Sequence, residues 1–416
     1  MVEGSLRPAG DKIRITAQLI RASDGTHLWS QTYDRDRDDV LAVQSEIAER
    51  VADVLGVFLD DKTRDFMATK GVRSADAFVD YQKGARLFYE AHAYGPFTQK
   101  LFEAQPALER ALSADREFSD AWLMHAIIYE RLLKLTLHGR PVAPFPERSP
   151  EALQQLLIGD LTEALQAART PHHRALIEFL RSLNSNDWSG LSAKMDAALG
   201  REECMADHGW SALALLFGKG DAAMRFTERR AICNPFDPGV YGVMIALHAK
   251  QQNYAAAHAD IAKGRELFGP RPPYTMAEFG LALLERDFAE AQRLLPIIGN
   301  DKWQQLLLAY QEGSPEAPEL HNVIKQEMIA GEFTKRHRTR MLLTLAAWSG
   351  DRAEASRLAE ELDKDSFGTA LLIEAAERCA CGSPFPLEAT PNFAKQLQLA
   401  GLEWTPSSLP WPNKDW

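Results

Sequence analysis

The chain has 416 residues, 25% of them charged and 45% hydrophobic, and its formal net charge is −11. This length suggests two or three domains or one extended repeat array, and the composition is that of an ordinary folded protein. The acidic balance argues against a nucleic-acid partner, because contacts with phosphates need a clustered basic face.

Neither an export signal nor a membrane span is predicted. Met1–Gly4 lacks the basic and apolar regions of a secretory signal, and no run approaches the ~18 apolar residues of a membrane helix. Four cysteines are too few for a disulfide framework, and Cys379 and Cys381 lack the second cysteine pair that a zinc site usually needs. We therefore expect a cytoplasmic protein with no membrane partner, no metal and no cofactor.

The chain begins with a predicted antiparallel sheet of three strands. Val2–Arg7 forms the first strand, and residues alternate between apolar and polar from Lys12 to Leu19, which is typical of a half-buried strand. Thr26–Tyr33 supplies the third strand, and the run of charges at Asp34–Asp39 is expected to end the sheet. An amphipathic helix is predicted over Val40–Val54. Val2–Arg7 should lie at an edge of this meander.

The stretch Glu3–Leu55 resembles the second half of the TolB-like amino-terminal domain of bacterial regulatory proteins. The resemblance rests on "EGSLRPAGDKIRITAQLIRASDGTHLWSQTYDRD" followed by "DVLAVQSEIAERVADVL". In those proteins the domain precedes tetratricopeptide repeats and often follows a nucleotide-cyclase or winged-helix DNA-binding domain. The family's earlier strand and helix are absent here, so residues 1–62 are expected to be a partial domain. The resemblance implies a regulatory role, and it does not extend to a cyclase catalytic segment.

Residues 74–416 are predicted to form a helical repeat array. The run Pro106–Tyr129 resembles a tetratricopeptide unit, with Trp122, Ala126 and Tyr129 on one helix face. Within the array, an acidic or amide residue recurs just before the predicted second helix of each pair, at spacings of 34, 32, 34 and 64 residues. A small residue follows some of these markers by four positions. The markers are Asp187, Asp221, Asn253, Asp287 and Asp351, and the small residues are Ala257, Ala291 and Ala355.

A tetratricopeptide-like period predicts pairs of helices stacked into a superhelix, with a degenerate repeat between Asp287 and Asp351. The first helices should line a concave face, and lie near 76–91, 119–135, 172–183, 207–217, 238–250, 274–285, 337–349 and 367–379. Their partners lie near 97–113, 151–168, 188–199, 221–232, 254–267, 287–297, 316–330, 351–362 and 392–400.

Two further segments carry expectations of their own. The basic run Lys335–Arg340 is predicted to begin a helix with a solvated basic face. The tail Leu402–Trp416, which holds Trp404, Trp411 and Trp416, is expected to pack over the last helices, and the alternative is a peptide that binds elsewhere.

The sequence contains no recognisable catalytic motif, and we expect the protein not to be an enzyme. The main hypothesis is a non-catalytic scaffold that binds a protein or peptide in the groove of the array. The alternative is a sensory or regulatory module of a bacterial signalling protein, acting on an output domain. The exposed edge of the first strand could also support a homodimer. Candidate groove residues are Tyr81, Trp122, Tyr129, Trp210 and Tyr241.

Overall fold

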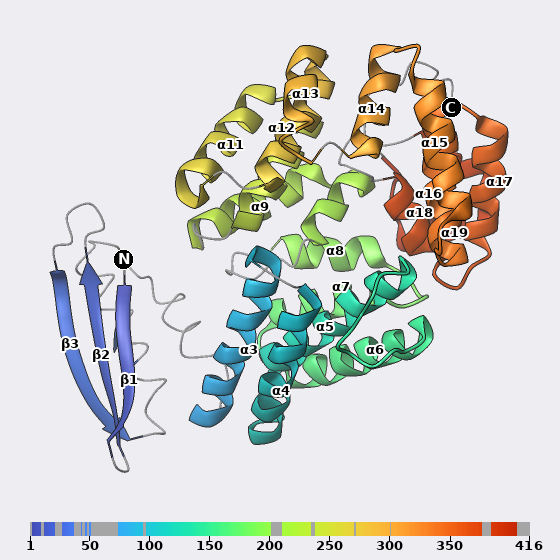
Figure 1. Cartoon of the computed structure of the whole chain (residues 1–416). Helices are drawn as coiled ribbons and strands as arrows, with labels where there is room; N and C mark the ends of the chain where they lie inside the picture. Colours follow the sequence, from blue (N-terminus) through green and yellow to red (C-terminus); the bar gives the residue numbers. More distant parts are fainter. Residues whose placement is uncertain are drawn as a thin grey trace. The chain divides into compact units, whose positions relative to one another are not determined.

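The computed structural model is mainly α-helical, with a three-stranded antiparallel sheet at its N-terminal end (Figure 1). It describes residues 2–9, 12–20, 27–36, 43, 46–47, 50, 74–94, 97–200, 210–233, 238–269, 272–299, 301–376 and 384–405. The chain divides into two compact units, Met1–Leu133 with Val142–Ile177 and Lys134–Pro141 with Glu178–Trp416. Among the described helices, none is long and apolar enough to cross a membrane.

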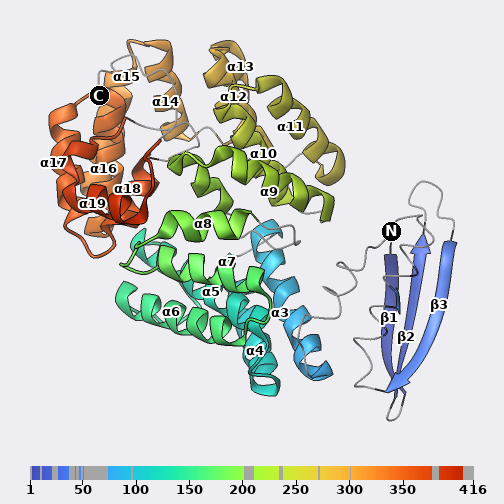
Figure 2. The ribbon, with the colours of Figure 1, turned by 180° about the vertical axis from the view of Figure 1, so that it is seen from behind.

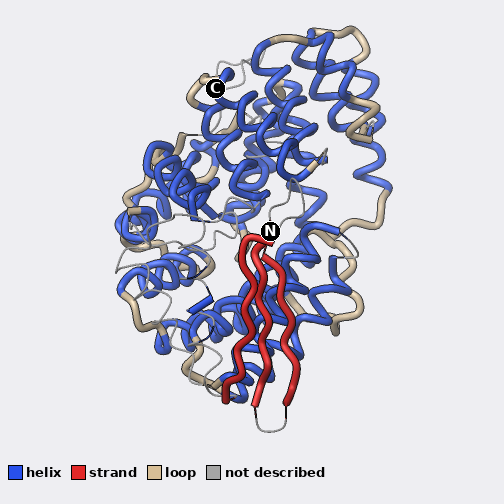
Figure 3. The backbone as a smooth tube through the Cα atoms, turned by 90° about the vertical axis from the view of Figure 1, so that its left-hand side faces the viewer, coloured by secondary structure: helices blue, strands red, loops and turns tan. Residues whose placement is uncertain are grey.

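The sheet has the order β1 (Val2–Ala9), β2 (Lys12–Ile20), β3 (His27–Asp36), so β1 is an edge, as predicted (Figure 3). β3 continues to Asp36, beyond the predicted end, because Arg14 of β2 lies opposite Asp34 and pairs with it at 2.7 Å. The apolar face of β2 is buried at Ile13, Ala17 and Leu19. Of the predicted helix over Val40–Val54, residues 43, 46, 47 and 50 are described, all as helical, and the others lie outside the described residues.

The helices of the first unit form antiparallel pairs whose close approach depends on small residues. A Cβ atom at Gly84 would lie 2.8 Å from the side chain of Leu108 on the neighbouring helix. Asp80 and Arg110 join the same two helices at 2.7 Å. These helices are α3 (Ala75–Tyr94), α4 (Phe97–Ala114), α5 (Ser119–Leu137), α6 (Pro150–Ala167) and α7 (Pro171–Leu183), of which α5 and α7 also contribute residues to the second unit.

The second unit continues the pairs along the chain (Figure 2). A helix at Lys302–Glu312, which the sequence did not predict, pairs with Ala317–Ala330 and supplies the repeat expected between Asp287 and Asp351. The elements are α8 (Leu191–Leu199), η2 (Trp210–Phe217, a 3-10 helix), α9 (Gly220–Cys233), α10 (Pro238–Lys250), α11 (Tyr254–Phe268), α12 (Pro272–Glu285), α13 (Phe288–Leu294), α14 (Lys302–Glu312), α15 (Ala317–Ala330), α16 (Lys335–Ser349), α17 (Arg352–Asp363), α18 (Gly368–Ala376), η4 (Leu387–Ala389) and α19 (Pro391–Ala400).

Three of the predicted markers form the same two-residue junction between paired helices. At the α16–α17 junction, Gly350 is left-handed (φ 77°), and the N–H of Asp351 bonds to Ala346 O at 3.0 Å, which closes the first helix. The Asp351 carboxylate then accepts from the N–H of Glu354 at 3.1 Å and opens the second helix. Asp287 and Asn253 repeat this geometry after Arg286 and Gln252, which are also left-handed.

The markers and their small residues thus have a structural cause in the second unit. Ala257, Ala291 and Ala355 are fully buried at the helix contacts that follow each junction. Asp187 and Asp221 behave differently, because Gly190 is the N-cap of α8 and Asp221 lies inside the first turn of α9. The predicted position just before the second helix is therefore wrong for Asp187 and Asp221. These two residues do not form the junction seen at Asp351.

The C-terminal segment packs against the first elements of the second unit. Trp404 contacts Phe393 of α19 at 5.1 Å and Phe217 of η2 at 6.1 Å between ring centroids, and the N–H of Thr405 donates to Leu216 O at 2.7 Å. Trp404 therefore packs on the last helix, as predicted for the tail. It also packs on η2, which was not predicted. Trp411 and Trp416 lie outside the described residues.

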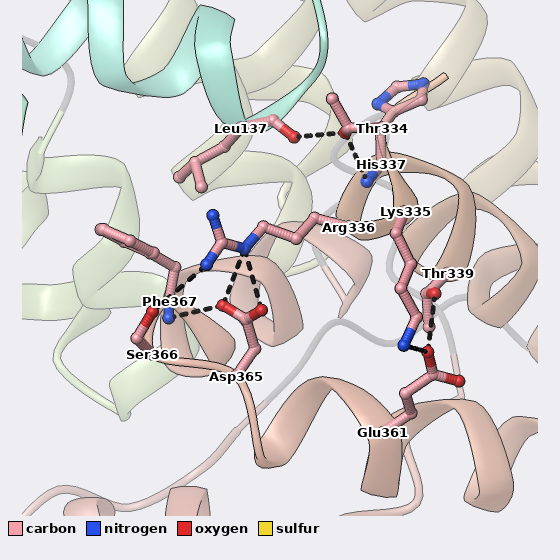
Figure 4. A network of polar contacts seen from close by, with 10 residues as sticks. All are labelled: Leu137, Thr334, Lys335, Arg336, His337, Thr339, Glu361, Asp365, Ser366 and Phe367. Carbon is pink, nitrogen blue, oxygen red and sulfur yellow. Dashed lines mark hydrogen bonds and ion pairs between the residues drawn. The ribbon is translucent and has the colours of Figure 1, made fainter. Parts of the chain in front are cut away.

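The basic run at the start of α16 is held in internal contacts, so the prediction of a solvated basic face is wrong for Arg336 and Arg338. Figure 4 shows Arg336 reaching both carboxylate oxygens of Asp365, at 2.8 and 3.0 Å, beside the ring of Phe367. Arg338 donates to the carbonyl oxygens of Met328 and Gly331 and so caps the end of α15. Lys335 remains largely exposed.

A half-buried ionic contact lies one turn further along α16. His138 Nε2 donates to Glu374 Oε2 at 2.6 Å, and Arg340 NH1 lies 3.7 Å from the same oxygen. Burial by itself would raise the pKa of Glu374, but the hydrogen bond from His138 and the charges of His138 and Arg340 more than offset it and lower that pKa. Burial also lowers the pKa of Arg340, although Glu374 opposes this effect.

Replacing Phe393 with alanine should destabilise the second unit by about 3–5 kcal/mol, because a fully buried ring that holds the returning C-terminal segment would leave a cavity. Chemical denaturation followed by tryptophan fluorescence measures the change. Leu399→Ala, at an exposed position of the same helix, is the matched control and should change stability by less than about 1 kcal/mol. Equal effects of both substitutions would contradict the packing described.

Replacing Glu374 with glutamine should lower stability at neutral pH by about 1–3 kcal/mol, because Arg340 and His138 lose a charged acceptor. Since folding lowers the pKa of Glu374, the wild-type contribution is present above the ordinary glutamate value of 4.5 and is lost as the pH falls below it. The variant should therefore lose less stability than wild type across that acid range, as measured by denaturation at a series of pH values. Glu319→Gln, on an exposed position, should follow the wild-type profile.

Candidate functional site

Two of the predicted groove residues, Tyr81 and Trp122, come together in the first unit. The Tyr81 ring lies 4.7 Å from that of Phe118, and Trp122 Nε1 donates to Arg116 O at 2.9 Å. Both side chains are half-buried against the cluster formed by Ala77, Phe78, Ala111, Leu112, Phe118 and Ala121. Their first role is packing, and a contact with a ligand through the remaining exposed surface stays a prediction.

Two of the other predicted groove residues, Tyr129 and Tyr241, do not offer an open aromatic surface. Tyr129 is buried beside His125 in the first unit, and this burial raises the pKa of its hydroxyl. Tyr241 is buried in the second unit against Phe268. The side chain of Trp210 lies outside the described residues.

The second unit contains a pocket of about 500 Å³ between α11, α12 and α13. Glu278, Ala282 and Glu285 line it from α12, and their spacing of four and three residues places them on one face of that helix. His258 of α11 and the first turn of α13, with Asp287 and Glu290, complete the lining. α12 corresponds to the predicted first helix at 274–285, the class of helix expected to line the groove.

The acidic lining of this pocket is partly neutralised by basic side chains. His258 Nε2 lies 2.8 Å from Glu285 Oε2, and Arg265 NH2 donates to Glu278 at 2.6 Å. A hydrogen bond from Arg293 lowers the pKa of Glu290, which therefore stays ionised. Two of these pairs are open to solvent, because the side chains of His258 and Glu285 are 50% and 34% exposed and those of Arg293 and Glu290 are 60% and 38% exposed.

The lining of the pocket is suited to binding a basic group. Its residues supply carboxylates, one imidazole and a methyl group, and the Asp287 carboxylate is already used to cap α13. Nowhere in the described part of the chain do three or more His, Cys, Asp or Glu side chains form a group that could hold a metal ion. What the arrangement can do is exchange an exposed ion pair for one with a basic group of a partner.

A second hollow, of about 740 Å³, lies along α15 and is lined mainly by Pro315, Pro318, Val323 and neighbouring polar residues. Neither hollow was predicted from the sequence. The spacing Glu278, Ala282, Glu285 could have indicated the first, since it places two carboxylates and a small residue on one helix face. The ion pairs from α11 could not have been found in this way, because they depend on how two helices pack.

The described helices fit a helical-repeat protein, whereas no protein-family model matches the chain. Over 128 residues the chain is 30% identical to a Rhizobium meliloti (strain 1021) protein described as "Putative adenylate cyclase 3". This match covers 31% of the chain and 21% of that relative, so the chain matches only about a fifth of the length of the curated relative. Part of the chain is therefore similar to part of a protein whose name, a putative adenylate cyclase, indicates a role in signalling.

Proposed function

We propose that the chain is a non-catalytic helical-repeat scaffold that binds a protein or peptide as part of a bacterial signalling system. The observation that carries the proposal is the repeated junction at Asn253, Asp287 and Asp351, which stacks helix pairs in a fixed geometry. Such an array is ordered before a partner arrives, so binding an extended segment costs little conformational entropy of the scaffold.

The pocket on α11–α13 is the part of this scaffold best suited to hold a partner side chain. Its carboxylates and the net charge of −11 favour a partner segment with a basic residue. Such a residue would replace His258 at Glu285, an exposed pair of the lining.

The signalling context is supported by the similarity to part of the Rhizobium meliloti protein. It also favours the second candidate function, in which the chain is a sensory or regulatory module that acts on a separate output domain. The two candidates differ in whether the bound partner changes the activity of such a domain.

A photo-crosslinking amino acid at position 258 should capture a discrete partner when the chain is expressed in its native cells, because this position faces the pocket. The same amino acid at Lys263 is the matched control, since both sites lie on α11 and their side chains are equally exposed, at 50% and 51%. Gel mobility and mass spectrometry identify the adducts. The same adducts from both positions, or none from either, would count against the pocket as the binding site.

Purified chain should produce no cyclic AMP from ATP and Mg²⁺, because the proposed role is binding. The assay compares product formed by the native chain with that formed by a heat-denatured sample. Turnover that scales with the concentration of native chain would overturn the non-catalytic part of the proposal.

A further inference from the structure

Among the described residues, none covers the outer edge of the sheet along β1. Every side chain described for Val2–Pro8 is exposed, including Val2 at 54% and Leu6 at 50%. Both lie on the same face as Ile13, Ala17 and Leu19, which are buried. β3, at the other edge, has Tyr33 buried and Leu28 and Trp29 half-buried. The apolar face of the sheet is therefore left incomplete on the β1 side.

The polar face of the same strand carries two charges without partners in the described part of the chain. Arg7 lies directly opposite Arg14, whose own partner is Asp34 at 2.7 Å, so Arg7 faces a like charge. Glu3 lies opposite the uncharged Gln18. Neither Glu3 nor Arg7 forms an ion pair within the described residues.

We infer that β1 pairs with β1 of a second copy of this chain, antiparallel and centred on Ser5. This register places Glu3 of each copy opposite Arg7 of the other, and it extends the charged row from Arg7, Arg14 and Asp34 so that Arg7 gains a neighbour of opposite sign. The inference concerns the sheet alone and does not depend on the scaffold function proposed above.

The apolar face is completed by the same register. Leu6 comes to lie opposite Gly4 of the second copy, and the residues flanking that glycine on this face are Val2 and Leu6. Gly4 is required by β2, because a Cβ atom there would lie 2.8 Å from Thr16 O. The missing side chain leaves room for the two Leu6 side chains to approach each other diagonally.

The backbone also suits this pairing. Pro8 is tolerated in an edge strand when its nitrogen faces away from the sheet. Leu6 and Gly4, two and four residues before Pro8, then present their N–H and C=O groups outward, where each can exchange hydrogen bonds with the other in the second copy. Pro8 has no N–H to donate, so the ladder ends where Pro8 meets Val2.

Opposite charges on one edge strand select this register against others. Pairing centred on residue 3 or residue 7 would bring two Glu3 or two Arg7 side chains together, and a shift by one residue would place the apolar face of one copy beside the polar face of the other. Charged edge strands resist pairing with strands in general. Here Glu3 and Arg7 disfavour the registers that bring like charges together and favour the one in which they meet.

The test is a charge exchange between copies of the full chain, read by multi-angle light scattering over a concentration series. The wild-type chain should dimerise in a concentration-dependent manner, as expected for a small interface. Glu3→Arg and Arg7→Glu should each raise the dissociation constant at least about tenfold, because two ion pairs become two repulsive pairs.

The two single variants should form a heterodimer when mixed, since one chain then carries arginine and the other glutamate at both positions 3 and 7. The double variant Glu3→Arg with Arg7→Glu should dimerise like wild type. Recovery on mixing excludes misfolding of the single variants as the cause of their dissociation. A monomeric wild-type chain at its highest soluble concentration, or single variants that dimerise like wild type, would overturn the inference.

Discussion

The helix pairs of the second unit depend on a two-residue junction in which a left-handed residue is followed at once by an Asx N-cap. This junction satisfies the last carbonyl groups of one helix and the first N–H groups of the next with no intervening loop. It thereby fixes the angle at which the two helices leave each other. The fully buried alanines at 257, 291 and 355 are the consequence, because the helices then approach too closely for a larger side chain. The pocket on α11–α13 is built directly around one such junction, at Asp287.

A stack of helix pairs must also cover the apolar surface at its ends. In the second unit, aromatic side chains from distant parts of the sequence meet where the C-terminal segment returns to η2. Trp188, Phe217, Phe393 and Trp404 contact one another in sequence-distant pairs, with ring centroids 5.1–6.5 Å apart. Lys250 Nζ adds a hydrogen bond to Thr405 O. This packing buries apolar surface that an open end would leave in water.

Charged residues in this protein divide into those that hold the fold and those that remain available for binding. Arg336, Arg338 and Arg340 belong to the first group, since Asp365, the carbonyl groups of α15 and Glu374 engage them. The second group includes Glu3 and Arg7 on the sheet edge and the exposed His258–Glu285 pair. The basic run Lys335–Arg340 is thus mostly structural. Glu3 and Arg7 on β1 and the His258–Glu285 pair are the charges that we propose to contact partners.

The sequence by itself determined the class of the fold, the strand at the edge of the sheet and most helix positions, because alternation with a period of two and helical spacing are local properties. It also located Asn253, Asp287 and Asp351, since a cap is a contact between neighbours in the chain. Helix α14 was not predicted, although the Asp301 carboxylate accepts from the N–H of Trp303 and caps it, because this cap does not fall at the repeat spacing of the other markers. Only the tertiary structure decided that the basic run at Lys335–Arg340 is mostly internal, that Trp404 packs on Phe217, and that carboxylates of α12 and α13 form a pocket with His258. Each of these depends on residues far apart in sequence, whose approach is set by packing rather than by local pattern.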